Sequence, residues 1–163
     1  MMSSAVLENA PHTTVGMGQI VVARDAASLS AVLGSCIGVA LYHAGMKLGV
    51  LGHVVLPDSH GRKNNPGKFA DSAIPAMLQA MHGAGASRGG VIAKIVGGAS
   101  MFGAGGPLQI GEANARAVVA ALDAAGIPIV ARDIGGVNGR RVVLTCSNGK
   151  ITITIVGGLA KII

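Results

Sequence analysis

Aromatic residues are scarce in this chain of 163 residues, which contains two phenylalanines, one tyrosine and no tryptophan. Proteins that bind single-stranded nucleic acids use aromatic side chains as platforms on which the bases stack. The formal net charge of +6 favours an acidic partner, but the basic residues are scattered apart from Arg62-Lys63 and Arg140-Arg141. A solvated basic surface explains this charge as well as a binding patch does, and we expect no nucleic-acid partner.

Cysteines and long apolar runs are also few. Two cysteines are too few for a disulfide framework, so a reducing cytoplasm is the expected location. Half of the residues are hydrophobic, but no apolar run is long enough to span a membrane, and the first residues lack the pattern of a signal peptide. We therefore expect a cytoplasmic protein that does not insert into membranes.

The chain is long enough for one domain with a substantial core. Residues 1–13 are small and polar without periodicity, which predicts a flexible N-terminal tail, and residues 14–163 are expected to form the single domain. Helical spacing groups Ile74, Met77, Leu78 and Met81 on one face of a first helix, and Gly111-Glu112-Ala113-Asn114 opens a second one. With several strands, this predicts an α+β protein with mostly antiparallel strands and two main helices on one side.

One stretch of small residues surrounds a cysteine. Cys36 lies between glycines in Leu33-Gly34-Ser35-Cys36-Ile37-Gly38, and His53 lies in the next apolar segment. Ile37–Tyr42 and Met46–Leu56 are both predicted to be strands. A thiol nucleophile needs at least a cysteine and a nearby base such as histidine, and two neighbouring strands can supply both.

The predicted hairpin brings the two residues together. If Ala44-Gly45 forms the loop, Cys36 faces His53, Val39 faces Val50, Leu41 faces Leu48 and His43 faces Met46. Directly opposed Cβ atoms lie roughly 4.5–5.5 Å apart, which is close enough for a thiolate–imidazolium pair. The residues alone fit a small buried strand cysteine equally well, and a structural role is favoured for His53 taken by itself.

The second cysteine has a different environment. Asn148-Gly149 is a strong hairpin signal and places Cys146 opposite Ile151, in alternation with Val142 and Leu144. Because this face is apolar throughout, we expect Cys146 to be a buried structural thiol.

Longer motifs follow one another between Gly16 and Val156. They read LGSCIGV at 33–39, GHVVLP at 52–57, KFADSAIP at 68–75, AKIVGGASMF at 93–102, IGEAN at 110–114, GIPIVA at 126–131, GG at 135–136 and GRR at 139–141. In this order they resemble the CheD family, the chemoreceptor glutamine deamidases of bacterial and archaeal chemotaxis.

The resemblance implies a three-layer α/β/β sandwich, similar to the catalytic domain of the cytotoxic necrotizing factor toxins. It implies hydrolysis of selected receptor glutamine side chains to glutamate with release of ammonia, without a cofactor or metal. The family's catalytic cysteine and histidine match Cys36 and His53. The third member, usually a threonine, matches Ser30, which keeps the hydroxyl and lacks the methyl group.

The resemblance also implies two partners, the cytoplasmic region of methyl-accepting chemotaxis receptors and a CheC-type phosphatase. Two other functions remain open. One is a catalytically idle adaptor that binds the phosphatase or a receptor, and the other is a thiol hydrolase of a different amide or ester, including receptor glutamyl methyl esters. The presence of both Cys36 and His53 argues against the idle adaptor, whereas Ser30 is also compatible with a purely local backbone contact.

Overall fold

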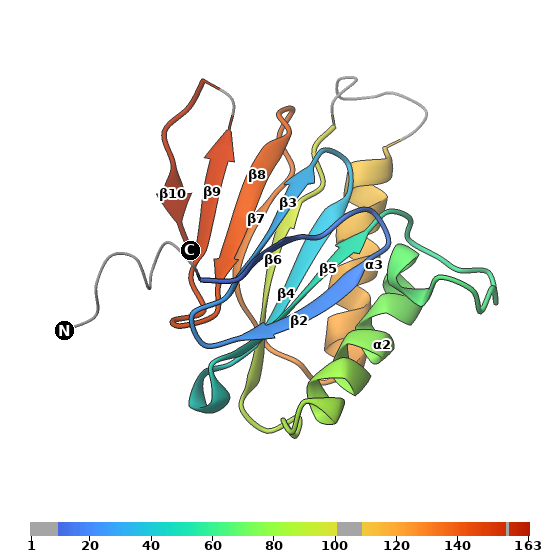
Figure 1. Cartoon of the computed structure of the whole chain (residues 1–163). Coiled ribbons are helices and arrows are strands. Elements are labelled where there is room, and N and C mark those ends of the chain that lie inside the picture. The colour runs from blue at the N-terminus through green and yellow to red at the C-terminus, as the bar shows by residue number, and fades with distance from the viewer. Residues whose placement is uncertain (1–9, 101–108, 156) are drawn as a thin grey trace.

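The computed structural model describes residues 10–100, 109–155 and 157–163, and these form two five-stranded sheets and two α-helices (Figure 1). The predicted α+β sandwich is confirmed. Residues 1–9 of the expected tail lie outside the described residues, and its last two residues, His12 and Thr13, begin a strand. No helix in the described ranges is both long and apolar enough to cross a membrane.

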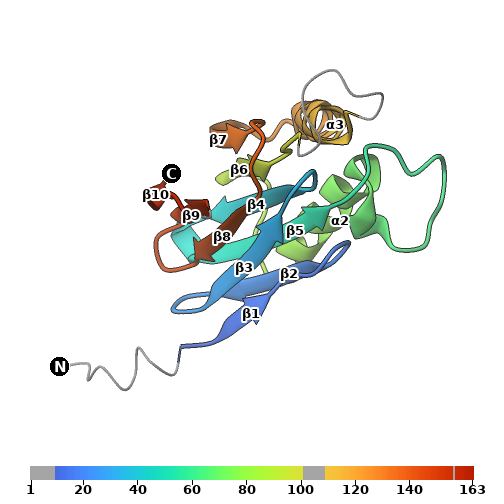
Figure 2. The same cartoon turned by 90° about the horizontal axis from the view of Figure 1, so that it is seen from above.

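The middle layer is the inner sheet, in which β2 (Ile20–Arg24), β5 (Leu48–Val54), β4 (Ile37–His43), β6 (Val91–Gly97) and β7 (Ile129–Ile134) lie side by side in this order. One face is covered by α2 (Ala70–Gly83) and α3 (Ile110–Ala124), as Figure 2 shows from above. The predicted apolar face of α2 is buried there, and so are Val118 and Leu122 of α3, because this sheet removes them from water.

The third layer is the outer sheet, with the order β1 (His12–Thr14), β3 (Ser28–Leu33), β8 (Arg140–Thr145), β9 (Ile151–Ile155) and β10 (Lys161–Ile162). It packs on the other face of the inner sheet. The apolar residues between the sheets form a second core, which includes Leu29, Leu33, Cys36, Ala40, Leu51 and Leu144. Short 3-10 helices, η1 (Ala44–Met46) and η2 (Pro66–Lys68), interrupt the connections on either side of β5.

The register of the β4–β5 hairpin differs from the prediction. His43 pairs with Leu48, so the connection contains η1 and Lys47 rather than Ala44-Gly45 alone. Lys47 adopts a left-handed conformation with φ of 48°, and its N–H donates to the carbonyl of Ala44. As a result Gly38, not Cys36, lies directly opposite His53.

The other predicted partners change with it, since Val39 pairs with Gly52 and Leu41 with Val50. The shift is two residues, and strand side chains alternate with a period of two. Each side chain therefore stays on its predicted face, with Val39 and Leu41 toward the helices and Cys36 toward the outer sheet.

The second hairpin is also longer than predicted. Leu144, not Cys146, pairs with Ile151, because Cys146 follows the end of β8 and its N–H donates to the carbonyl of Ala27 (3.0 Å). Burial of Cys146 is confirmed, and this burial raises the pKa of its thiol to about 11. The hydroxyl of Tyr42 donates to the Cys146 carbonyl (2.7 Å) and so joins this turn to the inner sheet.

Cys146→Ala is expected to keep in full the activity that the resemblance implies and to lose about 1 kcal/mol of unfolding free energy, because it leaves a small void in a packed region. Denaturant unfolding and an activity assay measure the two effects. A stable but inactive variant would mean that Cys146 is the reactive cysteine.

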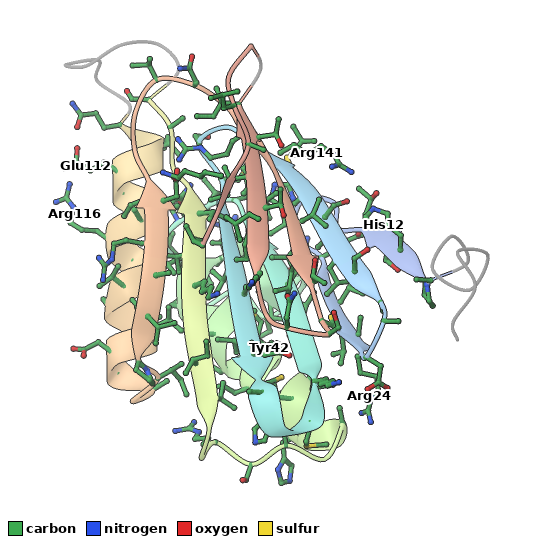
Figure 3. All side chains as sticks on the ribbon, turned by 90° about the vertical axis from the view of Figure 1, so that its left-hand side faces the viewer. His12, Arg24, Tyr42, Glu112, Arg116 and Arg141 are labelled. Atoms are coloured by element: carbon green, nitrogen blue, oxygen red, sulfur yellow. The ribbon has the colours of Figure 1, made fainter. Side chains whose placement is uncertain are left out.

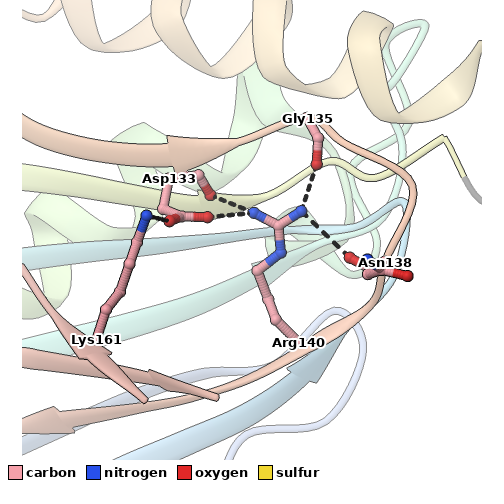
Figure 4. A network of polar contacts seen from close by, with 5 residues as sticks. All are labelled: Asp133, Gly135, Asn138, Arg140 and Lys161. Atoms are coloured by element: carbon pink, nitrogen blue, oxygen red, sulfur yellow. Dashed lines mark hydrogen bonds and ion pairs between the residues drawn. The ribbon is translucent and has the colours of Figure 1, made fainter. Parts of the chain in front are cut away.

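An ion-pair network around the buried Arg140 joins the two sheets at one end (Figure 4). Asp133 on β7 pairs with Arg140 on β8 and with Lys161 on β10. Arg140 also donates to the carbonyl oxygens of Asp133 (2.8 Å), Gly135 and Asn138 (3.2 Å). The guanidinium is thus bonded to the end of β7 and to the turn that follows it, although Arg140 belongs to the outer sheet, and its Nε has no partner among the described residues.

Asp133→Asn is expected to destabilise the protein by about 3 kcal/mol at neutral pH, because it leaves the buried Arg140 charge unpaired. Burial acts to raise the pKa of Asp133, but the hydrogen bond from Lys161 and the charge of Arg140 outweigh this effect, so that the pKa lies below the ordinary value of an aspartate. A lowered pKa stabilises the fold above the unfolded-state value, and this stabilisation is lost as the pH falls through the folded-state value.

The melting temperatures of wild type and Asp133→Asn should therefore converge as the pH falls from about 5 to about 2. Thermal melts at several pH values measure this, with Asp123→Asn at an exposed position of α3 as the control. A difference that stays constant with pH contradicts the assigned role of the carboxylate.

Candidate active site

Cys36 is the last residue before β4 and belongs to the core between the two sheets. Its side chain is 9% exposed, so the thiol lies just beneath the surface. This burial raises the pKa of the Cys36 thiol above its ordinary value, because a thiolate is poorly solvated there. In the resting protein Cys36 is therefore held in its thiol form.

His53 lies near the end of β5 and is 5% exposed. Its Nδ1 is 3.0 Å from the carbonyl oxygen of Val15. A carbonyl only accepts hydrogen bonds, so Nδ1 carries the proton, and Nε2 of the neutral ring is the nitrogen able to accept one. The backbone of His53 is also fixed. Its N–H donates to the carbonyl of Gln19 (3.1 Å), and its carbonyl accepts the N–H of Gly18 (2.8 Å).

The structure brings Cys36 and His53 to the same face of the inner sheet in a diagonal relation. His53 pairs with Gly38, and Cys36 precedes Gly38 by two residues. Diagonal neighbours are roughly 7–8 Å apart at the backbone, within the reach of a long side chain. Among the described residues Cys36 makes no side-chain hydrogen bond to His53, so the thiolate–imidazolium pair predicted from direct opposition is not formed in the free chain.

Ser30 does not share that face. Alternation along β3 directs Leu29 and Ala31 into the core between the sheets and Ser30 to the opposite side. There its hydroxyl lies 3.0 Å from Nε2 of His12, whose Nδ1 lies 2.7 Å from the hydroxyl of Ser28. Figure 3 shows His12 on β1, the edge strand of the outer sheet.

A backbone link nevertheless connects Ser30 with His53. The Ser30 carbonyl accepts the N–H of Val15 (2.7 Å), and the Val15 carbonyl accepts Nδ1–H of His53. Ser30 therefore holds the residue that orients the imidazole, although its own hydroxyl contacts His12.

The loop that carries Cys36 is fixed through three successive carbonyl groups. The carbonyl of Gly34 accepts the N–H of Ala99, and the carbonyl of Cys36 accepts the N–H of Gly98, both at 2.9 Å. The carbonyl of Ser35 accepts Nδ2 of Asn114 (3.1 Å). The end of β6 and the start of α3 thus determine the position of the thiol.

Asn114 was not singled out by the sequence reasoning as a functional residue. It is fully buried on α3, and its Nδ2 donates to the carbonyl of Val55 (2.9 Å) as well as to that of Ser35. One signal in the sequence could have indicated it: Asn114 stands at helical spacing before the buried Val118 and Leu122. A polar residue in such an apolar stripe needs a buried hydrogen-bond partner.

The glycines of the motifs allow this close approach. A Cβ atom at Gly97, where φ is +105°, would lie 2.3 Å from the carbonyl oxygen of Cys36. One at Gly111 would lie 2.5 Å from the carbonyl oxygens of Gly98 and Ala99. Any side chain at these positions would push α3 or β6 away from the Cys36 loop.

The sandwich therefore holds a buried thiol and a buried imidazole on one face, which is the arrangement of a candidate cysteine–histidine site. Residues 55–155 match the family model described as CheD chemotactic sensory transduction. With the relatives below, this match shows that the chain belongs to the CheD family.

Similar proteins align with most of the chain. One from Clostridium botulinum strain Eklund 17B, named probable chemoreceptor glutamine deamidase CheD, is 46% identical over 130 residues, which are 77% of this chain and 80% of the relative. A protein of the same name from Symbiobacterium thermophilum is 43% identical over 151 residues, 88% of this chain and 92% of the relative.

Proposed function

We propose that this protein is a chemoreceptor glutamine deamidase that converts selected glutamine side chains of receptors into glutamate and releases ammonia. The observation that carries the proposal is the common face of Cys36 and His53, with Nδ1 of the imidazole engaged by Val15. The names of the similar proteins support the receptor as substrate. We further propose a cytoplasmic location and binding to a CheC-type phosphatase, on the basis of family membership.

In the proposed mechanism His53 acts first as a general base. Nε2 accepts the thiol proton of Cys36 while the sulfur attacks the carboxamide carbon, and the carbonyl electrons move to oxygen. Because burial favours the thiol in the resting state, this proton transfer accompanies the attack rather than preceding it.

Collapse of the tetrahedral intermediate breaks the C–N bond, and the leaving nitrogen takes the proton from His53 to depart as ammonia. The remaining thioester is attacked by water, from which His53 removes a proton. Cleavage of the C–S bond then gives the glutamate side chain, and His53 returns its proton to the sulfur, which restores the Cys36 thiol.

Two further groups orient the imidazole in this proposal. The Val15 carbonyl holds the proton on Nδ1, so that Nε2 faces the reaction with a free electron pair. Ser30 acts as a positioning residue, since its carbonyl holds Val15 and its hydroxyl bonds to His12.

The direct test incubates the purified protein with a receptor cytoplasmic fragment and maps Gln-to-Glu conversion by mass spectrometry, with ammonia release measured in parallel. Conversion at defined glutamines supports the proposal, and its absence contradicts it. A parallel incubation with a methyl-esterified fragment tests ester hydrolysis: methanol release without ammonia release would assign the chain to the methylesterase alternative.

A further inference from the structure

The Ser35–Cys36 peptide is held in one orientation from outside the loop. Its carbonyl accepts the amide of Asn114, and the flanking carbonyls of Gly34 and Cys36 are each bound by backbone N–H groups of 98–99. Three consecutive peptide planes are thereby fixed, which leaves the loop little freedom to rotate its N–H groups.

The fixed carbonyl also determines where the N–H of Cys36 points. No cis peptide bond occurs in the described residues, and in a trans peptide the carbonyl and the N–H point in opposite directions. Because the Ser35 carbonyl points toward Asn114 on α3, the Cys36 N–H points away from that helix. Nothing in the described part of the chain accepts a hydrogen bond from it.

The chemistry of Asn114 supports a role for its two donor hydrogens. Both of its contacts are carbonyl oxygens, so the amide nitrogen must face Ser35 and Val55. Its Oδ1 is buried and makes no hydrogen bond within the described ranges, which costs free energy in the folded protein. A leucine of similar shape would avoid this cost but would leave both carbonyls without a donor.

We infer that Asn114 is a positioning residue that aims the N–H of Cys36 at the oxyanion of the deamidation reaction. The inference rests on the proposed function, in which the Cys36 sulfur attacks the substrate carboxamide. The second hydrogen bond of Asn114, to the carbonyl of Val55, connects the Cys36 loop to the segment that follows His53. It thereby fixes the positions of the nucleophile and the base relative to each other.

The assignment follows from where charge develops. When the C–S bond forms, the carbonyl oxygen of the substrate becomes negative next to the attacked carbon, within reach of the nucleophile's own N–H. A donor fixed in advance stabilises this charge more in the transition state than in the bound substrate. Loss of its alignment therefore lowers kcat and leaves KM nearly unchanged.

The test compares two reactions of Cys36 in the Asn114→Leu variant of the full chain. Deamidation of the receptor fragment should fall on the order of 10²-fold in kcat, the effect of losing an oxyanion donor. Alkylation of Cys36 by iodoacetamide should keep its rate and pH profile, because displacement of iodide at a tetrahedral carbon creates no oxyanion.

Leu122→Ala is the matched control, since it opens a cavity in the buried face of the same helix about two turns beyond Asn114. It should lose stability and keep kcat. Unreactive Cys146 reports the native fold in every sample, because this thiol is fully buried. If Cys146 becomes reactive in Asn114→Leu, this variant is not natively folded. The same two reactions are then measured in Asn114→Ala, which removes the same donors without adding bulk.

Two results overturn the inference while the proposed function stands. One is a folded Asn114 variant whose kcat stays within about twofold of wild type, and the other is a parallel loss of alkylation and deamidation, which would assign Asn114 to the nucleophile itself. A wild-type protein that converts no receptor glutamine rejects the proposed function and this inference together.

Discussion

Cys36→Ala is expected to abolish receptor deamidation while the protein remains folded. Removal of the nucleophile from a hydrolase of this kind lowers kcat by a factor on the order of 10⁶, because no other group forms the covalent intermediate. The fold should tolerate the change, since the side chain is small and lies at the margin of the core between the sheets.

Ammonia release and the mass of the receptor fragment measure the loss, and a thermal melt reports the fold. Cys146→Ala serves as the control, because it removes the chain's other thiol from a position distant from the candidate site. Turnover by purified Cys36→Ala would exclude Cys36 as the nucleophile.

His53→Ala should have the next largest effect, a fall in kcat of about 10²–10⁴-fold, because one imidazole serves both as base and as acid. Alkylation of Cys36 should also become slower, because burial already raises the thiol pKa and no base remains to accept the thiol proton as the sulfur attacks.

Measurements of kcat and of the rate of iodoacetamide labelling test both statements, with His82→Ala on the exposed side of α2 as the control. An unchanged labelling rate in His53→Ala would mean that His53 does not accept the thiol proton when Cys36 reacts. Unchanged kcat would remove His53 from the mechanism.

The sequence was sufficient to assign Cys36 and His53 to a common face but not to align them. Alternation along β4 and β5 depends only on the burial pattern, whereas the register depends on the turn. A lysine in a left-handed conformation at position 47 is not a recognisable turn signal, so the longer connection was missed. The error was two residues, which is why the face assignment survived it.

Long-range packing accounts for what the sequence did not reveal. The pairing of β1 with β3 is parallel and only three residues long, and part of it lies within the predicted tail. The contact of Ser30 with His12 therefore had no local pattern to indicate it. The bonds of Asn114 to Ser35 and Val55 likewise depend on how α3 lies against the inner sheet.

The group that orients His53 belongs to the main chain of Val15. Nineteen other amino acids would supply the same carbonyl, so a scan of substitutions at this position would report little more than a preference for apolar residues. Tolerance of substitutions at position 15 would therefore not mean that the residue has no function, because the functional atom belongs to the backbone. Replacement of a single backbone amide by an ester, which weakens the carbonyl as an acceptor, is the kind of chemical change that reveals such a group.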